Sequence, residues 1–298
     1  MNKKIIFKTL LFCVTLLIPF SLFGQDFSIN GTVLVKYRGD ADHVTIPEGI
    51  TAIGNQAFFL CSLTSVTIPT SVTSIGENAF LGCNSLASVN IPAGVASIGY
   101  GAFLNCSSLT GITVDMQNRA YSSEEGILFN KRKTALIQYP AGKPERSYTI
   151  PAGVTSIESY AFSDCNKLTS VTIPASVTSI GTGAFKCLNL RSITVDSQNP
   201  SFSSEAGVLF NRNKTILIQY PAGKTSGTYT VPDSVTSISG SAFIECINLT
   251  SITIPASVAS IGDFAFEECN NLQTVVISRK TKLGEGVFPD SVRITYSD

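Results

Sequence analysis

The sequence of 298 residues has no tryptophan, a single histidine and few charged residues. Only 14% of its residues are charged, against about 25% in an average soluble chain. Lys plus Arg and Asp plus Glu each number 21, so the chain lacks the basic excess of a nucleic-acid-binding protein. A single histidine excludes metal sites built on histidine pairs and argues against most acid–base catalysis. We therefore expect no enzyme activity, no cofactor and no nucleic-acid partner.

The first 24 residues have the layout of a secretory signal peptide. Three lysines precede an apolar run over Leu10–Phe20, and small or neutral residues then lead to an expected cleavage after Gly24. The alternative is a membrane anchor, but the run is shorter than the roughly 20 apolar residues of a spanning helix. We predict that residues 1–24 are removed on export and that the mature chain has no membrane span. Its expected location is the periplasm, the cell surface or the medium.

A motif of about 20 residues recurs along the rest of the chain, with adjacent copies 22 or 23 residues apart. The copy at Leu63 reads LTSVTIPTSVTSIGENAFLGC, and similar copies start at Leu86, Leu168 and Leu249. Alternating apolar residues in Leu-x-x-Val-x-Ile predict a short strand with one buried face, which the following proline ends. The glycine of Val-x-x-Ile-Gly is free to take a positive φ. The spacing of Ala-Phe-x-x-Cys-x-x-Leu predicts one short helical turn.

One such coil cannot bury its apolar side alone, so equivalent coils should stack and share one continuous core. Stacking predicts a buried phenylalanine ladder of Phe58, Phe80, Phe103, Phe162, Phe185, Phe243, Phe266 and Phe288. It predicts a second ladder of Cys61, Cys83, Cys106, Cys165, Cys187, Cys246 and Cys269. Neighbouring cysteines would lie within disulfide reach, but seven in one core position cannot all pair. We interpret them as free, buried thiols that act as small apolar fillers.

These residues resemble the bacterial BspA-like branch of the leucine-rich-repeat superfamily, whose repeat reads LxxVxIPxxVxxIGxxAFxxCxxL. The resemblance covers nearly all of the chain after the signal segment. It implies a curved leucine-rich-repeat solenoid of the α/β horseshoe class, β-dominated with short helical turns. It also implies an exported protein that has no catalytic residues. Such a protein is expected to bind an extracellular or cell-surface protein, for example as an adhesin. A glycan-binding surface module is the alternative, which the absence of tryptophan weakens.

Two longer segments between the repeats carry a second motif. The first begins at Ile112, where an apolar run, a polar turn at Asn130–Lys133 and a second run at Ala135–Tyr139 form a hairpin signature. The second begins at Ile193, and Asn30-Gly31 marks a shortened form near the N-terminus. The predicted order is a hairpin cap at 25–43, repeats at 44–111, a hairpin module at 112–149, repeats at 150–192, a hairpin module at 193–230, repeats at 231–277 and a C-terminal cap repeat at 278–298.

The hairpin modules hold the candidate residues for partner binding. The standard coils expose nearly the same small hydroxyl residues at each strand, such as Ser65 and Thr67, whereas the modules vary in aromatic and charged side chains. The candidates are Tyr121, Phe129, Lys131, Arg132, Tyr139, Phe202, Phe210, Arg212 and Tyr220. The alternative is that these aromatic residues pack inward and the modules only space the coils.

Two polar features have structural interpretations. The segments Asp115–Asn118 and Asp196–Asn199 could be calcium ligands, but their spacing suits Asx turns that end a strand. The lone His43 lies beside two aspartates, and we interpret it as a surface loop residue. Neither feature predicts a reactive site.

Overall fold

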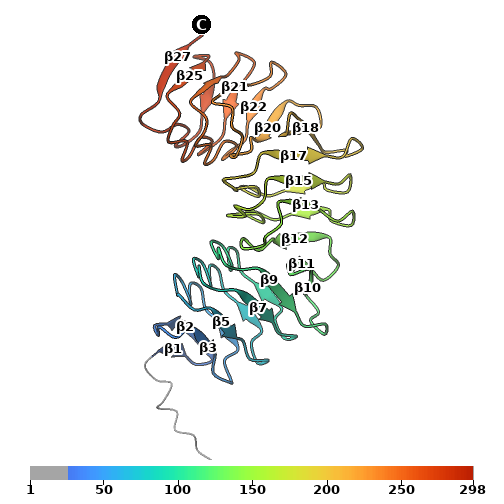
Figure 1. Cartoon of the computed structure of the whole chain (residues 1–298), viewed down its shortest axis with the longest axis vertical. Coiled ribbons are helices and arrows are strands. Elements are labelled where there is room, and N and C mark those ends of the chain that lie inside the picture. Colours follow the sequence, from blue (N-terminus) through green and yellow to red (C-terminus); the bar gives the residue numbers. More distant parts are fainter. Residues whose placement is uncertain (1–25, 298) are drawn as a thin grey trace, which may run out of the picture.

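A computed structural model describes residues 26–297 of the chain, so the predicted signal peptide at 1–24 lies outside the described residues. The chain forms an elongated, curved β-solenoid whose coils follow one another along its long axis (Figure 1). All regular elements of the described chain are β-strands, and none of its residues is in a helix. The architecture is therefore a β-solenoid, and the helical layer of an α/β horseshoe is not present in residues 26–297.

The Leu-x-x-Val-x-Ile segments form one side of the solenoid as three parallel sheets. The first contains β3 (His43–Thr45), β5 (Ser65–Thr67), β7 (Ser88–Ile91) and β9 (Gly111–Val114). The second contains β13 (Ser147–Thr149), β15 (Ser170–Ile173) and β17 (Ser192–Val195). The third contains β21 (Thr228–Thr230), β23 (Ser251–Thr253), β25 (Thr274–Ile277) and β27 (Arg293–Tyr296). Equivalent residues pair in register, as Val44 does with Val66, so each repeat stacks on the next.

The hairpin strands and the two-residue strands of the coils form a second side, also in three sheets. The first contains β1 (Phe27–Asn30), β2 (Val33–Tyr37), β4 (Ala52–Ile53), β6 (Ser74–Ile75) and β8 (Ser97–Ile98). The second contains β10 (Tyr121–Glu124), β11 (Ile127–Asn130), β12 (Ala135–Gln138), β14 (Ser156–Ile157) and β16 (Ser179–Ile180). The third contains β18 (Phe202–Glu205), β19 (Val208–Asn211), β20 (Ile216–Gln219), β22 (Ser237–Ile238), β24 (Ser260–Ile261) and β26 (Lys282–Leu283).

Each of these three sheets begins with antiparallel strands and continues with parallel ones. Strands β1 and β2 pair antiparallel, and β2 then pairs parallel with β4. Strands β10, β11 and β12 pair antiparallel before β12 pairs parallel with β14, and β18, β19 and β20 lead to β22 in the same way. Residues 26–297 therefore consist of three blocks, each with its own pair of sheets.

The segment around each ladder phenylalanine contains turns where a short helical turn was predicted. Gln56 and Leu60, two residues before and after Phe58, have φ values of +56° and +59°. A right-handed helix cannot include such left-handed residues. The amides of Gln56, Phe58 and Leu60 instead donate to carbonyl oxygens of the next coil at 2.9, 2.7 and 2.9 Å. The predicted helical turn is wrong because these amides are directed to the neighbouring coil.

The glycine after Val-x-x-Ile also differs from its prediction. Gly76, Gly99 and Gly181 are absent from the residues with positive φ. A Cβ atom at Gly76 would lie 2.6 Å from the backbone nitrogen of Asn55 in the preceding coil. These glycines are therefore required by the close approach of two backbones and not by their φ.

The phenylalanine ladder is buried but divided. Phe58 stacks on Phe80 at 4.9 Å between ring centroids, and Phe80 on Phe103 at 5.5 Å. A tyrosine starts the stack of each block, since Tyr37, Tyr139 and Tyr220 lie against the first phenylalanine that follows. The other ladder rings, Phe162, Phe185, Phe243 and Phe266, are at most 2% exposed, whereas Phe288 at the end is partly exposed.

The buried side chains form three clusters, which corrects the expectation of one continuous core. Strand β11 lies between the first two clusters, because Leu128 belongs to the first and its neighbours Ile127 and Phe129 belong to the second. Alternate residues of a strand face opposite sides, so one strand can line two cores. Leu209 in β19 has the same role between the second and third clusters.

The cysteines Cys83, Cys106, Cys165, Cys187, Cys246 and Cys269 are free and buried, and Cys61 is free and partly buried. The Cys83 thiol donates to the carbonyl oxygen of Phe58 in the preceding coil at 3.0 Å, and Cys106 donates to that of Phe80 at 3.1 Å. The Cys83 and Cys106 thiols thus fill small apolar spaces and also donate to a backbone carbonyl oxygen of the preceding coil.

The stacked rings predict a large loss of stability for Phe162→Ala. We expect the free energy of unfolding to fall by about 3–5 kcal/mol, because coils held in register above and below cannot collapse into the hole. Denaturant unfolding followed by circular dichroism measures this loss. Phe288→Ala, at the partly exposed end, is the matched control and should lose less. A loss below about 1 kcal/mol for Phe162→Ala would contradict the ladder.

Candidate functional site

The nine predicted partner-binding residues differ in their accessibility. Four of the aromatic residues are at most 2% exposed, namely Phe129, Tyr139, Phe210 and Tyr220. Tyr121 and Phe202 are partly buried, and Lys131, Arg132 and Arg212 are exposed. In the folded protein the four buried rings contact the core and not the solvent. The basic residues therefore remain as the accessible candidates at the hairpin turns.

The two hairpin turns are held in the same way. The Asn130 Oδ1 atom accepts hydrogen bonds from the amides of Thr134 and Ala135 at 2.8 and 3.1 Å, and Asn211 makes the equivalent pair. Lys133 is 2.9 Å from Glu124, in an exposed ion pair. Such pairs add about 0–1 kcal/mol, so the asparagine contacts are the main constraint on the turn.

The Asx turns predicted at the ends of β9 and β17 are confirmed. The Gln117 amide donates to Asp115 Oδ1 at 2.8 Å. Asn118 is fully buried, its Nδ2 donates to Pro92 O and Val95 O, and its Oδ1 accepts two backbone amides. The amide oxygen is therefore engaged by the protein. Within residues 26–297, no group of three or more His, Cys, Asp and Glu residues could hold a metal ion.

His43 lies at the start of β3 and is exposed. Its Nδ1 atom is 2.7 Å from the hydroxyl of Ser65 in the next coil. The residue thus belongs to a strand edge and not to the predicted loop. No helix in the described part of the chain is long and apolar enough to cross a membrane.

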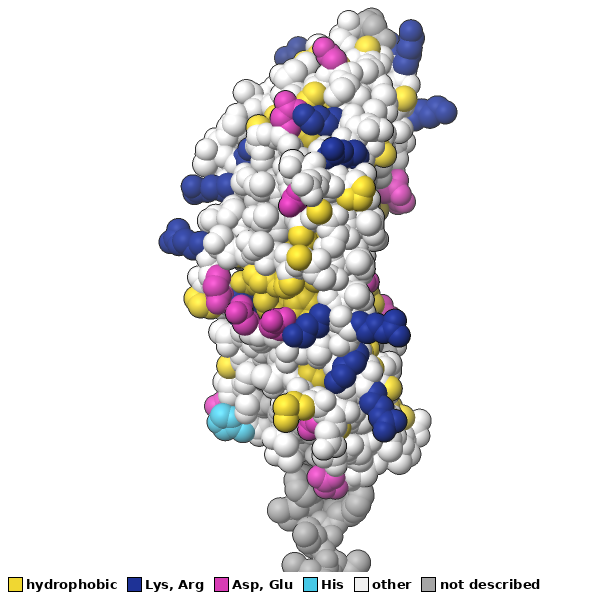
Figure 2. Space-filling model, turned by 90° about the vertical axis from the view of Figure 1, so that its right-hand side faces the viewer, with side chains coloured by type: hydrophobic (Ala, Val, Ile, Leu, Met, Phe, Trp, Pro, Cys, Tyr) yellow, Lys and Arg dark blue, Asp and Glu magenta, His cyan; other side chains and the backbone are white. Residues whose placement is uncertain are grey.

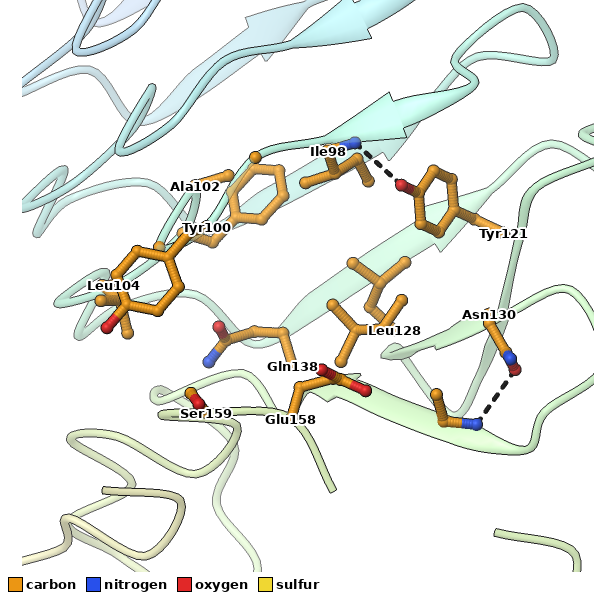
Figure 3. Close-up of a pocket in the computed structure, with 15 residues that line it drawn as sticks. Ile98, Tyr100, Ala102, Leu104, Tyr121, Leu128, Asn130, Gln138, Glu158 and Ser159 are labelled. Atoms are coloured by element: carbon orange, nitrogen blue, oxygen red, sulfur yellow. Dashed lines mark hydrogen bonds between the residues drawn. The ribbon is translucent and has the colours of Figure 1, made fainter. Parts of the chain in front are cut away.

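A cleft of about 410 Å³ lies at the junction of the first and second blocks (Figure 3). One wall is the last coil of the first block, with Ile98, Tyr100 and Phe103. Tyr121 and Leu128 of the hairpin strands lie opposite, and Gln138, Glu158 and Ser159 complete the lining. The volume is within the range of roughly 300–1,000 Å³ that is typical of ligand pockets. Residues distant in sequence thus form one partly apolar cavity with several polar groups.

The cleft exists because β8 is the last strand of its sheet. In the interior of the sheet the next coil would cover this strand. Here the Ile98 amide donates instead to the Tyr121 hydroxyl at 2.8 Å (Figure 3). Across the cleft's rim, the Tyr100 and Tyr160 rings meet edge to face at 5.8 Å. Burial and the proximity of Tyr160 raise the pKa of Tyr100 to about 12, so its hydroxyl is protonated at neutral pH.

The second junction has an equivalent but smaller cleft of about 160 Å³. It is lined by Gly183, Phe185 and Gln219, which correspond to Gly101, Phe103 and Gln138. Lys186 and Glu245 bridge this junction with a 3.1 Å ion pair. Burial raises the pKa of Glu245, and the adjacent Lys186 opposes that effect. Neither cleft was predicted from the sequence, although the interruptions of the repeat at the two hairpin segments are their signal.

Charged side chains are scattered over the surface without a large area of one sign on the face in Figure 2. Apolar side chains gather on that face near the middle of the long axis, with acidic and basic side chains beside them. This distribution agrees with the balanced composition of the chain.

The sequence matches the family described as BspA type leucine rich repeat region, with six copies over residues 36–140, 142–221 and 222–297. A leucine rich cell surface protein from Faecalibacterium prausnitzii A2-165 is similar at 34% identity and a TM-score of 0.54, over 86% of this chain and 60% of that one. A leucine-rich repeat protein from Eubacterium ventriosum ATCC 27560 is similar at 27% identity and a TM-score of 0.55, over 89% of this chain and 65% of that one. The chain thus spans less than two thirds of the length of these neighbours. No curated protein matches the sequence.

The thiols predict a specific reactivity with Ellman's reagent. Burial raises the pKa of the Cys106 thiol to about 12, and the thiolate is the reactive form. At pH 8 the native protein should therefore react slowly, with the partly buried Cys61 first. After denaturation without reductant, residues 26–297 should yield seven thiols. Two or fewer would mean that disulfides form.

The junctions predict a contrast in amide hydrogen exchange. The amides of Phe58 and Phe80 donate to the next coil, whereas the amides of Phe103 and Phe185 have no acceptor among the described residues. Unbonded amides beside an open cleft exchange faster. In protein labelled with ¹⁵N at phenylalanine, we expect Phe103 and Phe185 to exchange well before Phe58 and Phe80. Equal protection of all four would show that the junction amides are covered.

Proposed function

The chain belongs to the BspA-type leucine-rich-repeat family, and we propose that it is an exported, non-enzymatic protein that binds proteins at the cell surface in an adhesin-like role. The similarity to a leucine rich cell surface protein at 34% identity supports this location. The basic start and apolar run of residues 1–24 support export. A solenoid offers an extended surface that suits a macromolecular partner.

We place the partner contact at the hairpin turns. Segments 112–149 and 193–230 are interpreted as modules inserted between groups of repeats. Their turns carry Lys131, Arg132 and Arg212, which are exposed, whereas the coil strands expose mainly serine and threonine. Arginine is enriched in the residues that dominate protein interfaces. The observation that carries this proposal is the pair of equivalent turns with exposed basic residues.

The side chains on the turns are partly ordered before any partner binds. Lys131 Nζ donates to Met116 O at 3.2 Å, and the guanidinium of Arg212 donates to Ser197 O at 2.9 Å. Ordered side chains lose less conformational entropy on association. A basic turn of this kind favours an acidic surface on the partner.

The test replaces the basic residues of both turns, Lys131, Arg132, Lys133, Arg212 and Lys214, with serine or glycine. Asn130 and Asn211 stay unchanged because they hold the turns. Binding to a partner isolated by pull-down from extracellular proteins should weaken by about tenfold or more, equal to about 1.4 kcal/mol. Surface plasmon resonance measures the affinity.

A control that removes basic residues away from the turns is Lys280→Ser with Lys282→Ser, two exposed lysines in the last coil. Circular dichroism checks that both variants fold. Unchanged binding by the turn variant would refute the role of the turns. Capture of glycans on an array, with no protein captured, would refute protein binding in favour of the glycan-binding alternative.

A further inference from the structure

One set of backbone hydrogen bonds between neighbouring coils recurs along the solenoid. In four coils the amides at the phenylalanine, two residues before it and two residues after it all donate to the following coil, as Gln56, Phe58 and Leu60 do. The acceptors are carbonyl oxygens of alternate residues, such as Glu77, Ala79 and Leu81. The spacing of donors and acceptors is thus a property of two polypeptide backbones.

The last coil of the first block has the same donor amides, but no following coil of the described chain supplies carbonyl oxygens to accept from them. The amides of Gly101 and Phe103 line the cleft and have no acceptor among residues 26–297. The Ile98 carbonyl lies at the same edge, where the equivalent Ile75 carbonyl accepts the Gly99 amide of the next coil at 2.8 Å. The Phe103 ring stacks on Phe80, and the residue is 3% exposed and lies in the same buried cluster as Leu128 of β11.

We propose that this cleft binds a short polypeptide segment of a partner protein, which takes the place of the missing coil. Carbonyl oxygens of the segment accept from the amides of Gly101 and Phe103, and one of its amides donates to Ile98 O. The inference rests on the proposed function only in that the partner is a protein, since the basic residues of the hairpin turns do not line the cleft.

The lining favours a peptide over other ligands. The Glu158 carboxylate lies in the cleft (Figure 3) and repels an anion, but pairs with a lysine or arginine of a peptide. A sugar does not present acceptors at the spacing of a backbone. The second cleft, at about 160 Å³, is too small for the same segment. That cleft is an internal control.

The probe is the peptide acetyl-GTGAFKS-amide, which has the sequence of residues 181–187 with the change Cys187→Ser. In the protein, the carbonyls of Thr182, Ala184 and Lys186 accept the amides of the preceding coil. The peptide is titrated to millimolar concentration into the protein labelled with ¹⁵N at glycine and phenylalanine. We expect the Gly101 and Phe103 resonances to shift while those of Gly183 and Phe185 stay in place.

Two variants at an exposed position of the lining complete the test. Glu158→Trp fills the cleft and should weaken binding about tenfold or more, whereas Glu158→Ser has the residue of the equivalent Ser239 and should still bind, with loss of only the contact to the peptide's lysine. Circular dichroism confirms that both variants fold. Absence of shifts at Gly101 and Phe103 with the peptide overturns the proposal, as does a shift of these resonances by maltohexaose alone.

The titration also separates the two proposals. Peptide binding at the cleft together with unchanged partner binding by the turn variant would refute only the role of the turns. Loss of partner binding in the turn variant without peptide binding would refute only the role of the cleft.

Discussion

Backbone hydrogen bonds from coil to coil are the interaction on which the rest of the structure depends. They run along both strand sides and also through the phenylalanine segment, where Phe58 donates to Ala79 O. Because every coil must lie flat against the next, bulky groups at the contact are excluded. Gly76 is required where a Cβ atom would lie 2.6 Å from the backbone of the preceding coil. The ladders of Phe and Cys follow from the same register, since equivalent residues of successive coils face each other.

The same constraint explains why the molecule consists of blocks. A coil can be left uncovered only where another element closes the core beside it. Strands β11 and β19 do this, since alternate side chains such as Leu128 and Phe129 line the clusters on their two sides. Tyr139 and Tyr220 then start the next stacks in place of a phenylalanine. The uncovered amides of Gly101 and Phe103 are the consequence of this interruption.

The exposed aromatic and charged side chains are unequally distributed because the coils stack. Stacking requires nearly identical coils, and identical coils expose nearly identical side chains. The strands of the standard coils expose mainly serine and threonine, whereas at the interruptions Lys131 and Arg212 lie on turns and Tyr100, Tyr121 and Glu158 line a cleft. Both proposed contact surfaces therefore lie at the hairpin segments and block junctions and not on the standard strands.

The sequence by itself determined the family, the coil and the identity of the buried ladders, because a repeat of about 23 residues can bury its apolar positions only by stacking. It also indicated the Asx turn at Asp115, since that contact is local. The absence of helix from residues 26–297, their three separate cores and the clefts were decided by the tertiary structure. The φ of Gln56 depends on an acceptor in the next coil, 21 residues away at Glu77. The burial of Phe129 and Tyr139 depends on which side of a strand faces a core, and a local pattern cannot contain that information, because both sides of the strand are covered.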